Sequence, residues 1–176
     1  MQDWSNIGDL TNWLLRYNRH MAHIHEKIDF TATVFIVHKD KVLLRKHEKY
    51  GFWLGVGGHI ELDEDPNEAA VREVQEEVGL AVVLWDGNKK FKEDFAFKGG
   101  EHRELIPPIA MNRHSTTPGH EHIDLVYFAR AASDTVIPEN PTDTWRWCAA
   151  EELDELDLLT DVRFYARLAL EIIKSP

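Results

Sequence analysis

The most constraining feature of the sequence is the segment from residue 58 to residue 80, in which a helix is marked at both ends. Asp65 is a typical N-cap residue, Pro66 suits the first helical position, and Glu68 is spaced to complete a capping box. Gly79 is placed to end the helix in a left-handed conformation. The sequence therefore predicts a short helix between Asp65 and Gly79, entered from a glycine-containing extended run.

This predicted helix has two chemically different faces. One sector of about 60° is aliphatic, consists of Val71, Val74 and Val78, and is expected to pack against the rest of the domain. Another sector of about 100° is acidic and consists of Glu73, Glu76 and Glu77. Like charges four residues apart on an exposed helix cost only about 0.2 to 0.5 kcal/mol per pair, so energetics alone also allow an ordinary solvated acidic face.

The spacing of the whole segment separates these two interpretations. It reads Gly58, five residues, Glu64, seven residues, Arg72-Glu73-Val74, one residue, Glu76-Glu77, one residue, Gly79-Leu80. This pattern resembles the Nudix box, Gx5Ex7REUxEExGU with U an aliphatic residue, at every specified position. With a chance of roughly one in ten at each of the seven fixed positions and about one in three at the two aliphatic ones, which is generous beside average residue usage, a random match is expected on the order of 10⁻⁸ times per window. The similarity extends more loosely over about residues 29–155 and does not reach the first 28 residues.

The resemblance implies a hydrolase with Mg²⁺ or Mn²⁺ as cofactor. Such an enzyme cleaves the diphosphate linkage of a nucleoside diphosphate linked to another moiety, so a small nucleotide-diphosphate molecule is the expected substrate. Carried over from the matching positions, the resemblance implies that Glu73 and Glu77 are the leading metal ligands and that Glu73 is also a catalytic residue. It further implies Glu76 as a third ligand and a carbonyl group of Gly57 or Gly58 as a backbone ligand. Hard divalent cations prefer such oxygen donors, which supports these residue types.

Other candidates flank the acidic face. The resemblance implies that Glu64 and Arg72 form a structural pair that holds the loop against the helix. Arg45 and Lys46, in the run ahead of the box, are candidates for binding substrate phosphate. The alternative interpretation of these two cations is an ordinary charged sheet edge.

A further catalytic carboxylate, acting as a water ligand or general base, is expected on a loop outside the box. Glu139 lies in a turn-rich loop six residues before Trp145, and Glu121 lies at the start of a predicted strand. Either residue is also compatible with an ordinary surface position, and the sequence leaves the choice between them open.

Two other functions are compatible with the same fold. The first is a catalytically inactive Nudix-fold module that binds a nucleotide or regulates a partner, which the intact acidic cluster disfavours. The second is an isomerase of isopentenyl diphosphate, whose chemistry uses a reactive cysteine. Cys148 is the only cysteine and lies late in the chain beside an aromatic strand, which disfavours this second alternative.

Two pairs of histidines, His23 with His25 and His120 with His122, are spaced so that each pair would share one face of a strand. Pairs of this kind can contribute to a zinc site. No third ligand at a telling spacing accompanies either pair, so the sequence disfavours this interpretation.

The remaining pattern predicts an α+β fold, a Nudix-type α/β/α sandwich with a mixed β-sheet. Extended runs are expected at residues 31–38, 41–47, 52–60, 80–85, 91–98, 104–111, 123–130 and 144–149. A C-terminal helix is expected to bury Phe164, Leu168 and Ile172 on one face. Residues 1–28 are interpreted as an added N-terminal amphipathic helix, and residues 29–176 as the hydrolase domain.

Composition limits the expected partners. The formal net charge of −11 argues against non-specific binding to nucleic acid or to an anionic membrane, because both depend on clustered Lys and Arg. No apolar run approaches the length of a membrane span, and a single cysteine fits a reducing compartment. We therefore expect a cytoplasmic protein without a nucleic-acid or membrane partner, in which the N-terminal helix allows a homodimer.

Overall fold

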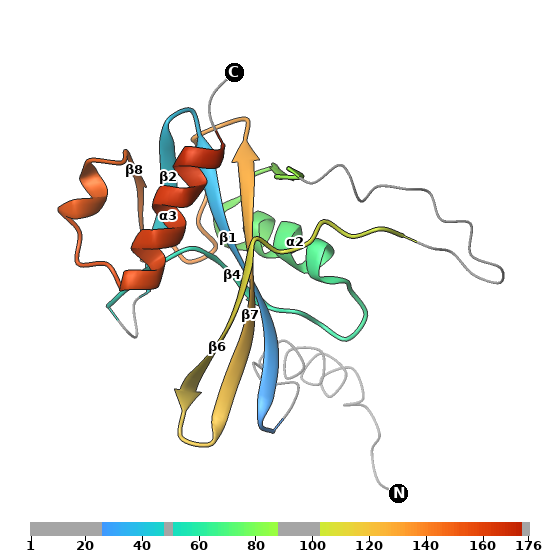
Figure 1. Cartoon of the computed structure of the whole chain (residues 1–176). Coiled ribbons are helices and arrows are strands. Elements are labelled where there is room, and N and C mark those ends of the chain that lie inside the picture. Colours follow the sequence, from blue (N-terminus) through green and yellow to red (C-terminus); the bar gives the residue numbers. More distant parts are fainter. Residues whose placement is uncertain (1–25, 48–50, 88–102, 174–176) are drawn as a thin grey trace, which may run out of the picture.

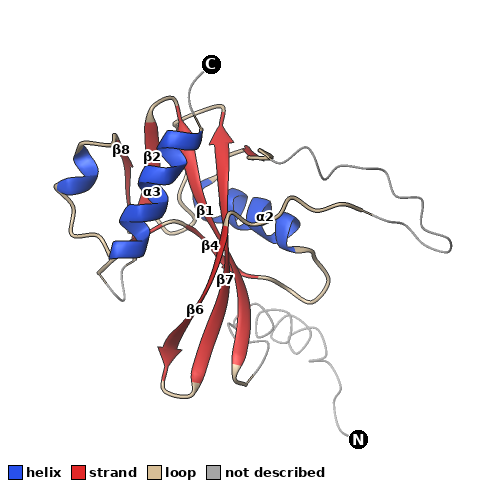
Figure 2. Ribbon diagram, in the orientation of Figure 1, coloured by secondary structure: helices blue, strands red, loops and turns tan. Residues whose placement is uncertain are grey.

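The computed structural model describes residues 26–47, 51–87 and 103–173. Within these ranges an eight-stranded sheet lies between two helices, α2 (Pro66–Val78) on one face and α3 (Thr160–Ile172) on the other (Figures 1 and 2). The predicted α/β/α sandwich is therefore confirmed. The N-terminal helix and the extended run predicted at residues 91–98 lie outside the described residues.

The sheet is mixed, as predicted. Its strands are β1 (Ile28–His38), β2 (Lys41–Lys46), β3 (Trp53–Leu54), β4 (Val56–His59), β5 (Val82–Leu84), β6 (Ala110–Thr117), β7 (His120–Ala131) and β8 (Thr144–Cys148). The central order is β3-β2-β1-β7-β5, with β4 paired to β1, β6 to β7 and β8 to β2. β1 and β7 run parallel, whereas the other described pairs are antiparallel. A short 3₁₀ helix, Glu152–Asp154, follows β8.

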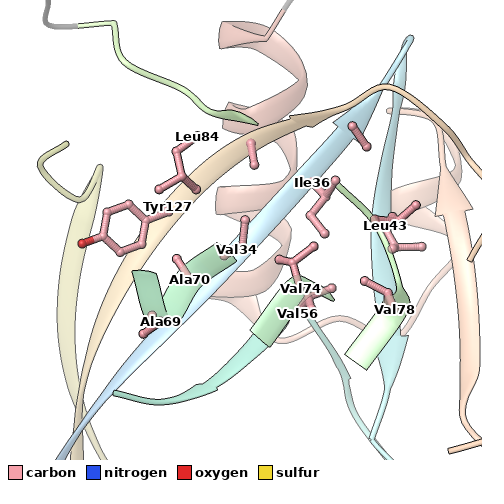
Figure 3. Packing of buried hydrophobic residues seen from close by; sticks show 14 of the residues in the cluster. Val34, Ile36, Leu43, Val56, Ala69, Ala70, Val74, Val78, Leu84 and Tyr127 are labelled. Atoms are coloured by element: carbon pink, nitrogen blue, oxygen red, sulfur yellow. The ribbon is translucent and has the colours of Figure 1, made fainter. Parts of the chain in front are cut away.

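The central strand β1 is buried on both faces because its side chains alternate between the two helices. Val34 and Ile36 belong to the cluster that packs against α2, and Phe35 and Val37 belong to the cluster that packs against α3. Figure 3 shows the first cluster, in which Val74 of α2 points toward the sheet. β1 thus positions α2, and with it the acidic face, relative to the rest of the sheet.

Helix α2 begins and ends where the sequence predicts. The Asp65 carboxylate accepts hydrogen bonds from the backbone N–H groups of Asn67 at 2.8 Å and Glu68 at 3.0 Å. The Glu68 carboxylate in turn accepts from the Asp65 N–H at 3.1 Å, which completes the capping box. Gly79 ends the helix with a φ of 66°, a left-handed conformation that glycine adopts without strain.

The buried face of α2 is rotated relative to the prediction. Val71 was expected to pack against the sheet, but it is 39% exposed. The small residues Ala69 and Ala70 are fully buried with Val74 and Val78 instead (Figure 3). Small side chains let the start of the helix approach the sheet closely, so the contact is centred on them and the valine at position 71 turns toward solvent.

The face predicted for the C-terminal helix is wrong in part. Phe164 is 59% exposed, while α3 buries Val162, Ala166 and Ala169 against the sheet. Leu168 and Ile172 lie at the edge of this contact and are only partly buried.

No helix in the described part of the chain is both long and apolar enough to cross a membrane.

Two extended runs also differ from the prediction. The run expected at residues 104–111 becomes a strand only from Ala110, because Pro107 and Pro108 have no N–H to donate to a neighbouring strand. The run expected at residues 52–60 is divided into β3 and β4 at Gly55, where a Cβ would lie 2.8 Å from Thr33 Cγ2.

Candidate active site

Gly58 allows the acidic face of α2 to lie directly against β4, and Gly57 allows β4 to lie close to β1. A Cβ on Gly58 would lie 2.5 Å from the carboxylate carbon of Glu73, and a Cβ on Gly57 would overlap the carbonyl oxygen of Ala32. The Gly57 N–H also donates to Glu77 Oε2 at 3.2 Å. The glycine pair therefore brings the β4 backbone against the two glutamates that the resemblance implies as metal ligands.

Arg72 connects the loop before α2 to the acidic face. Its Nε and Nη2 donate to the two carboxylate oxygens of Glu64 at 2.9 and 2.6 Å, which is a bidentate pair. Its Nη1 donates to Glu73 at 2.9 Å and to Glu76 at 3.0 Å. Its Nη2 also donates to the His59 carbonyl oxygen at 2.9 Å. One guanidinium thus holds the loop, the end of β4 and two glutamates of the acidic face in fixed relative positions.

Glu77 makes a second set of contacts within the site. Its side chain is 14% exposed and forms an ion pair with Nη1 of Arg45, which comes from β2. Nη2 of the same arginine lies 2.7 Å from Asp143 Oδ2, and its guanidinium carbon lies 5.4 Å from the centroid of the Trp145 ring. Burial raises the pKa of Glu77 to about 7, although the charge of Arg45 acts in the opposite direction. The site therefore favours added positive charge near this carboxylate.

The donor set fits a hard divalent cation. The pKa of Glu73 is also raised, because the effect of burial exceeds the opposite effect of its hydrogen bond with Arg72. Five carboxylates share this region with the guanidinium groups of Arg45 and Arg72: Glu64, Glu73, Glu76, Glu77 and Asp143. This excess of negative charge is unfavourable where side chains are partly desolvated, and a bound divalent cation would relieve it. Glu73, Glu76 and Glu77 could hold Mg²⁺ or Mn²⁺, with the backbone of the glycine pair beside them.

Of the two candidate loop carboxylates, the structure brings Glu139 to the end of α2. The Glu139 N–H donates to the Glu77 carbonyl oxygen at 3.1 Å, and the Ile137 N–H donates to the Val78 carbonyl oxygen at 2.9 Å. These bonds satisfy carbonyl groups that a helix end leaves without intrahelical partners. They also fix the loop beside the acidic face, while the Glu139 side chain remains exposed.

The structure places Glu121 further from the acidic face. It aligns with Ile28 of β1, whereas Gly58 aligns with Ala32, four residues further along the same strand. At 3.2 to 3.4 Å per residue this separation is roughly 13 Å. The Glu121 carboxylate accepts hydrogen bonds from Arg113, which lowers its pKa.

Two other candidates also lie away from the acidic face. Lys46 follows Arg45 in β2 and is exposed, and the alternation of strand side chains directs it to the opposite face of the sheet. Cys148 is fully buried in β8, where burial raises the pKa of its thiol. A buried, protonated thiol does not fit the reactive cysteine that an isomerase would need.

Sequence reasoning missed Asp143, the second partner of Arg45. Its carboxylate side chain is only 4% exposed, yet the chain contains 31 acidic residues and this one has no distinctive spacing relative to the arginine. The pairing depends on the antiparallel contact of β2 with β8, in which Arg45 aligns with Trp145. Only a prediction of that strand register would have indicated that Arg45 and Asp143 lie close together.

The fold and the site together define a class: an α/β/α sandwich whose mixed sheet carries a candidate divalent-cation site on a capped glutamate helix. The family model described as NUDIX domain matches residues 28–168. The chain therefore belongs to the Nudix family, and the resemblance first given by the box is confirmed.

Similar proteins support this assignment. A crystal structure of a NUDIX-family hydrolase from Clostridium perfringens matches with a TM-score of 0.75 and 37% sequence identity, covering 83% of this chain and 98% of that chain. The Nudix hydrolase YvcI of Bacillus subtilis (strain 168) is 35% identical over 65 residues. An octanoyltransferase of Myxococcus xanthus is 48% identical over 70 residues. These two matches cover 36% and 39% of this chain, but only 39% and 18% of the curated relatives.

Proposed function

We propose that the protein is a metal-dependent hydrolase that cleaves the diphosphate linkage of a nucleoside diphosphate linked to another moiety. The observation that carries this proposal is the grouping of Glu73, Glu76 and Glu77 on one face of α2, directly against the Gly57–Gly58 backbone. Membership of the Nudix family supports the same reaction class. The substrate is proposed at the level of its diphosphate group, because that is the part that a cation and these side chains would recognise.

The glutamates of the acidic face would hold Mg²⁺ or Mn²⁺, which would neutralise the diphosphate charge and acidify or orient the attacking water. The surrounding residues keep these carboxylates in place. Arg72 donates to both Glu73 and Glu76, and the Gly57 N–H fixes one oxygen of Glu77. Side chains held in this way lose little further conformational freedom when the substrate binds, which favours catalysis.

Glu139 is the general base in this proposal. Its backbone is fixed to the last turn of α2 by the bond to the Glu77 carbonyl oxygen, and its side chain is exposed, so it is accessible to water and substrate. A base must come within hydrogen-bonding distance of the water proton that it accepts, and the position of this loop favours Glu139 over Glu121. Glu121 is the alternative, and its separation from Gly58 makes it a useful comparison.

Arg45 is proposed to bind a substrate phosphate. Its guanidinium bridges Glu77 and Asp143, so it already lies at the edge of the acidic face. A cation bound at Glu77 would weaken the attraction between that carboxylate and Arg45, which leaves guanidinium N–H groups able to donate to a phosphate oxygen. Asp143 would keep the Arg45 side chain in position while its partner changes from Glu77 to the phosphate. Lys46 is the less favoured candidate for the same role, because strand alternation directs its side chain to the opposite face of the sheet.

The test is a substrate screen combined with matched variants. Purified protein with Mg²⁺ is incubated with dNTPs, 8-oxo-dGTP, ADP-ribose, dinucleoside polyphosphates and nucleotide sugars, and the release of phosphate or pyrophosphate is measured. We expect turnover of at least one class, a loss of at least a hundredfold in Glu77→Gln, and a larger loss in Glu139→Gln than in Glu121→Gln. Nucleotide binding without turnover across the panel would contradict the hydrolase and favour the binding module.

A further inference from the structure

A second group of possible metal ligands lies on the face of the sheet opposite α2. Asp29 of β1, His59 of β4 and His122 of β7 each offer one ligand atom, and these three atoms lie within 4.8 Å of one another. His59 Nε2 lies 3.7 Å from Asp29 Oδ2. The His59 and His122 rings are nearly perpendicular, with centroids 4.9 Å apart. Three strands thus direct two imidazoles and one carboxylate toward a common point.

The strand pairing explains why these residues meet. Asp29 aligns with His122 across the parallel β1–β7 pair, and Thr31 aligns with His59 across the antiparallel β1–β4 pair. Because side chains two residues apart share one face of a strand, Asp29 and Thr31 point to the same side, and the two histidines flank β1 there. The ends of β1 and β7 that carry this group extend past both helices (Figure 1).

The group is separate from the glutamate site. A Cβ on Gly58 would meet Glu73 of α2, so this position faces α2. The next residue, His59, therefore directs its ring to the other face of β4. One strand thus presents backbone to the glutamates on one side and an imidazole to Asp29 on the other.

Asp29 is unusual for a carboxylate at the end of a strand because it is completely buried. Buried charges in proteins are normally paired or coordinate a metal ion. His120 Nε2 lies 3.1 Å from Asp29 Oδ2, and His120 Nδ1 lies 3.2 Å from the Glu26 carbonyl oxygen. His120 is therefore placed to orient the carboxylate from outside the ligand group, as residues around metal ligands commonly do.

We propose that Asp29, His59 and His122 form a binding site for Zn²⁺, distinct from the glutamate site of α2. Two imidazole nitrogens and one carboxylate oxygen form a typical zinc ligand set, whereas Mg²⁺ strongly prefers oxygen donors. Zinc–ligand distances of about 2.0 to 2.1 Å place tetrahedral ligands roughly 3.3 Å apart, so ligand atoms that lie within 4.8 Å of one another need to approach by at most about 1.5 Å. Three protein ligands leave a fourth position open to water.

Zinc binding to the full-length protein tests this proposal. The protein is stripped with chelator, returned to buffer with millimolar Mg²⁺ to occupy oxygen-donor sites, and titrated with Zn²⁺ against a chromophoric chelator. Metal content after dialysis is measured by mass spectrometry. We expect one zinc ion per chain, with affinity at least tenfold lower in His59→Gln and in His122→Gln. His120→Gln, which removes a positioning residue, should weaken binding by about tenfold while the stoichiometry stays at one.

Two control variants separate this site from others. Glu77→Gln alters the glutamate site and should leave zinc affinity within twofold of wild type. His38→Gln changes a histidine of β1 that contacts the Ala131 carbonyl oxygen, outside the group, and should also have no effect. Substitution with Co²⁺ gives a second measurement, since visible absorption bands should appear in wild type and be lost in Asp29→Asn. Absence of zinc binding by the wild type, or unchanged zinc affinity in folded His59→Gln and His122→Gln proteins, would overturn the proposal.

Discussion

Replacing Glu77 with glutamine should stabilise the metal-free protein at alkaline pH, even though it is expected to remove activity. Burial raises the pKa of this carboxyl group from 4.5 to about 7 in the folded state. Between pH 4.5 and about pH 7, Glu77 holds a proton in the folded protein that it has already released in the unfolded chain. The contribution of Glu77 to the free energy of unfolding of the wild type therefore falls as the pH rises through this interval and levels off above pH 7. Glutamine carries no charge that burial would desolvate, so the Glu77→Gln protein does not lose this part of its free energy of unfolding.

The size of the effect follows from the pKa values. One pKa unit corresponds to 1.36 kcal/mol, so the shift of Glu77 from 4.5 to about 7 amounts to roughly 3 kcal/mol at high pH. Between pH 5 and pH 8 the advantage of Glu77→Gln over the wild type should grow by about 2 to 3 kcal/mol. Its absolute value will be smaller by about 1 kcal/mol, because a neutral amide accepts less strongly from Arg45 and from the Gly57 N–H.

Urea unfolding at pH 5, 6, 7 and 8, in the presence of EDTA, measures this difference directly. Glu76→Gln is the matched control, since that side chain is 53% exposed and its replacement should change the unfolding free energy by no more than about 0.5 kcal/mol. A difference between Glu77→Gln and wild type that stays constant across this pH range would refute the reasoning.

Three further predictions concern the same helix. Saturating Mg²⁺, at about 100 times its dissociation constant, should raise the free energy of unfolding of the wild type by about 2.7 kcal/mol and leave Glu77→Gln nearly unchanged, as measured by thermal or urea unfolding with and without the ion. Gly58→Ala should lower Mg²⁺ affinity in calorimetry at least tenfold, because its Cβ would lie 2.5 Å from the Glu73 carboxylate; an unchanged affinity would show that the close approach is not required. Asp65→Ala should destabilise the protein by about 1 kcal/mol in urea through loss of the N-cap, whereas Asp65→Asn should retain most of the stability.

Helix α2 could be predicted from the sequence in detail because the interactions that define it are local. The capping box joins Asp65 to Glu68, and Gly79 donates its N–H to the Gln75 carbonyl oxygen, so each bond spans only three or four residues. The buried face could not be predicted equally well. Periodicity shows which residues share a face, but the distance between helix and sheet decides whether the small Ala69 or the larger Val71 occupies the contact.

The candidate site shows the same division between local and distant contacts. The glutamates of the acidic face lie on one helix, so their grouping follows from spacing alone. The pairing of Arg45 with Asp143, and the meeting of Asp29, His59 and His122, require strands far apart in the sequence to adopt a specific register. The sequence contained every one of these residues, but nothing in their spacing indicated that they would lie side by side.

The position of β4 would allow the protein to keep the two proposed metal sites apart. Its glycine pair brings backbone to the oxygen donors of α2, while the next residue, His59, contributes nitrogen on the opposite face. Hard cations and zinc prefer different donor atoms, so the two sites can be selective without a barrier between them. The Arg72 bond to the His59 carbonyl oxygen fixes the backbone at the junction. A displacement of β4 would therefore disturb both proposed ligand sets, so we expect each of them to depend on the contact between this strand and α2.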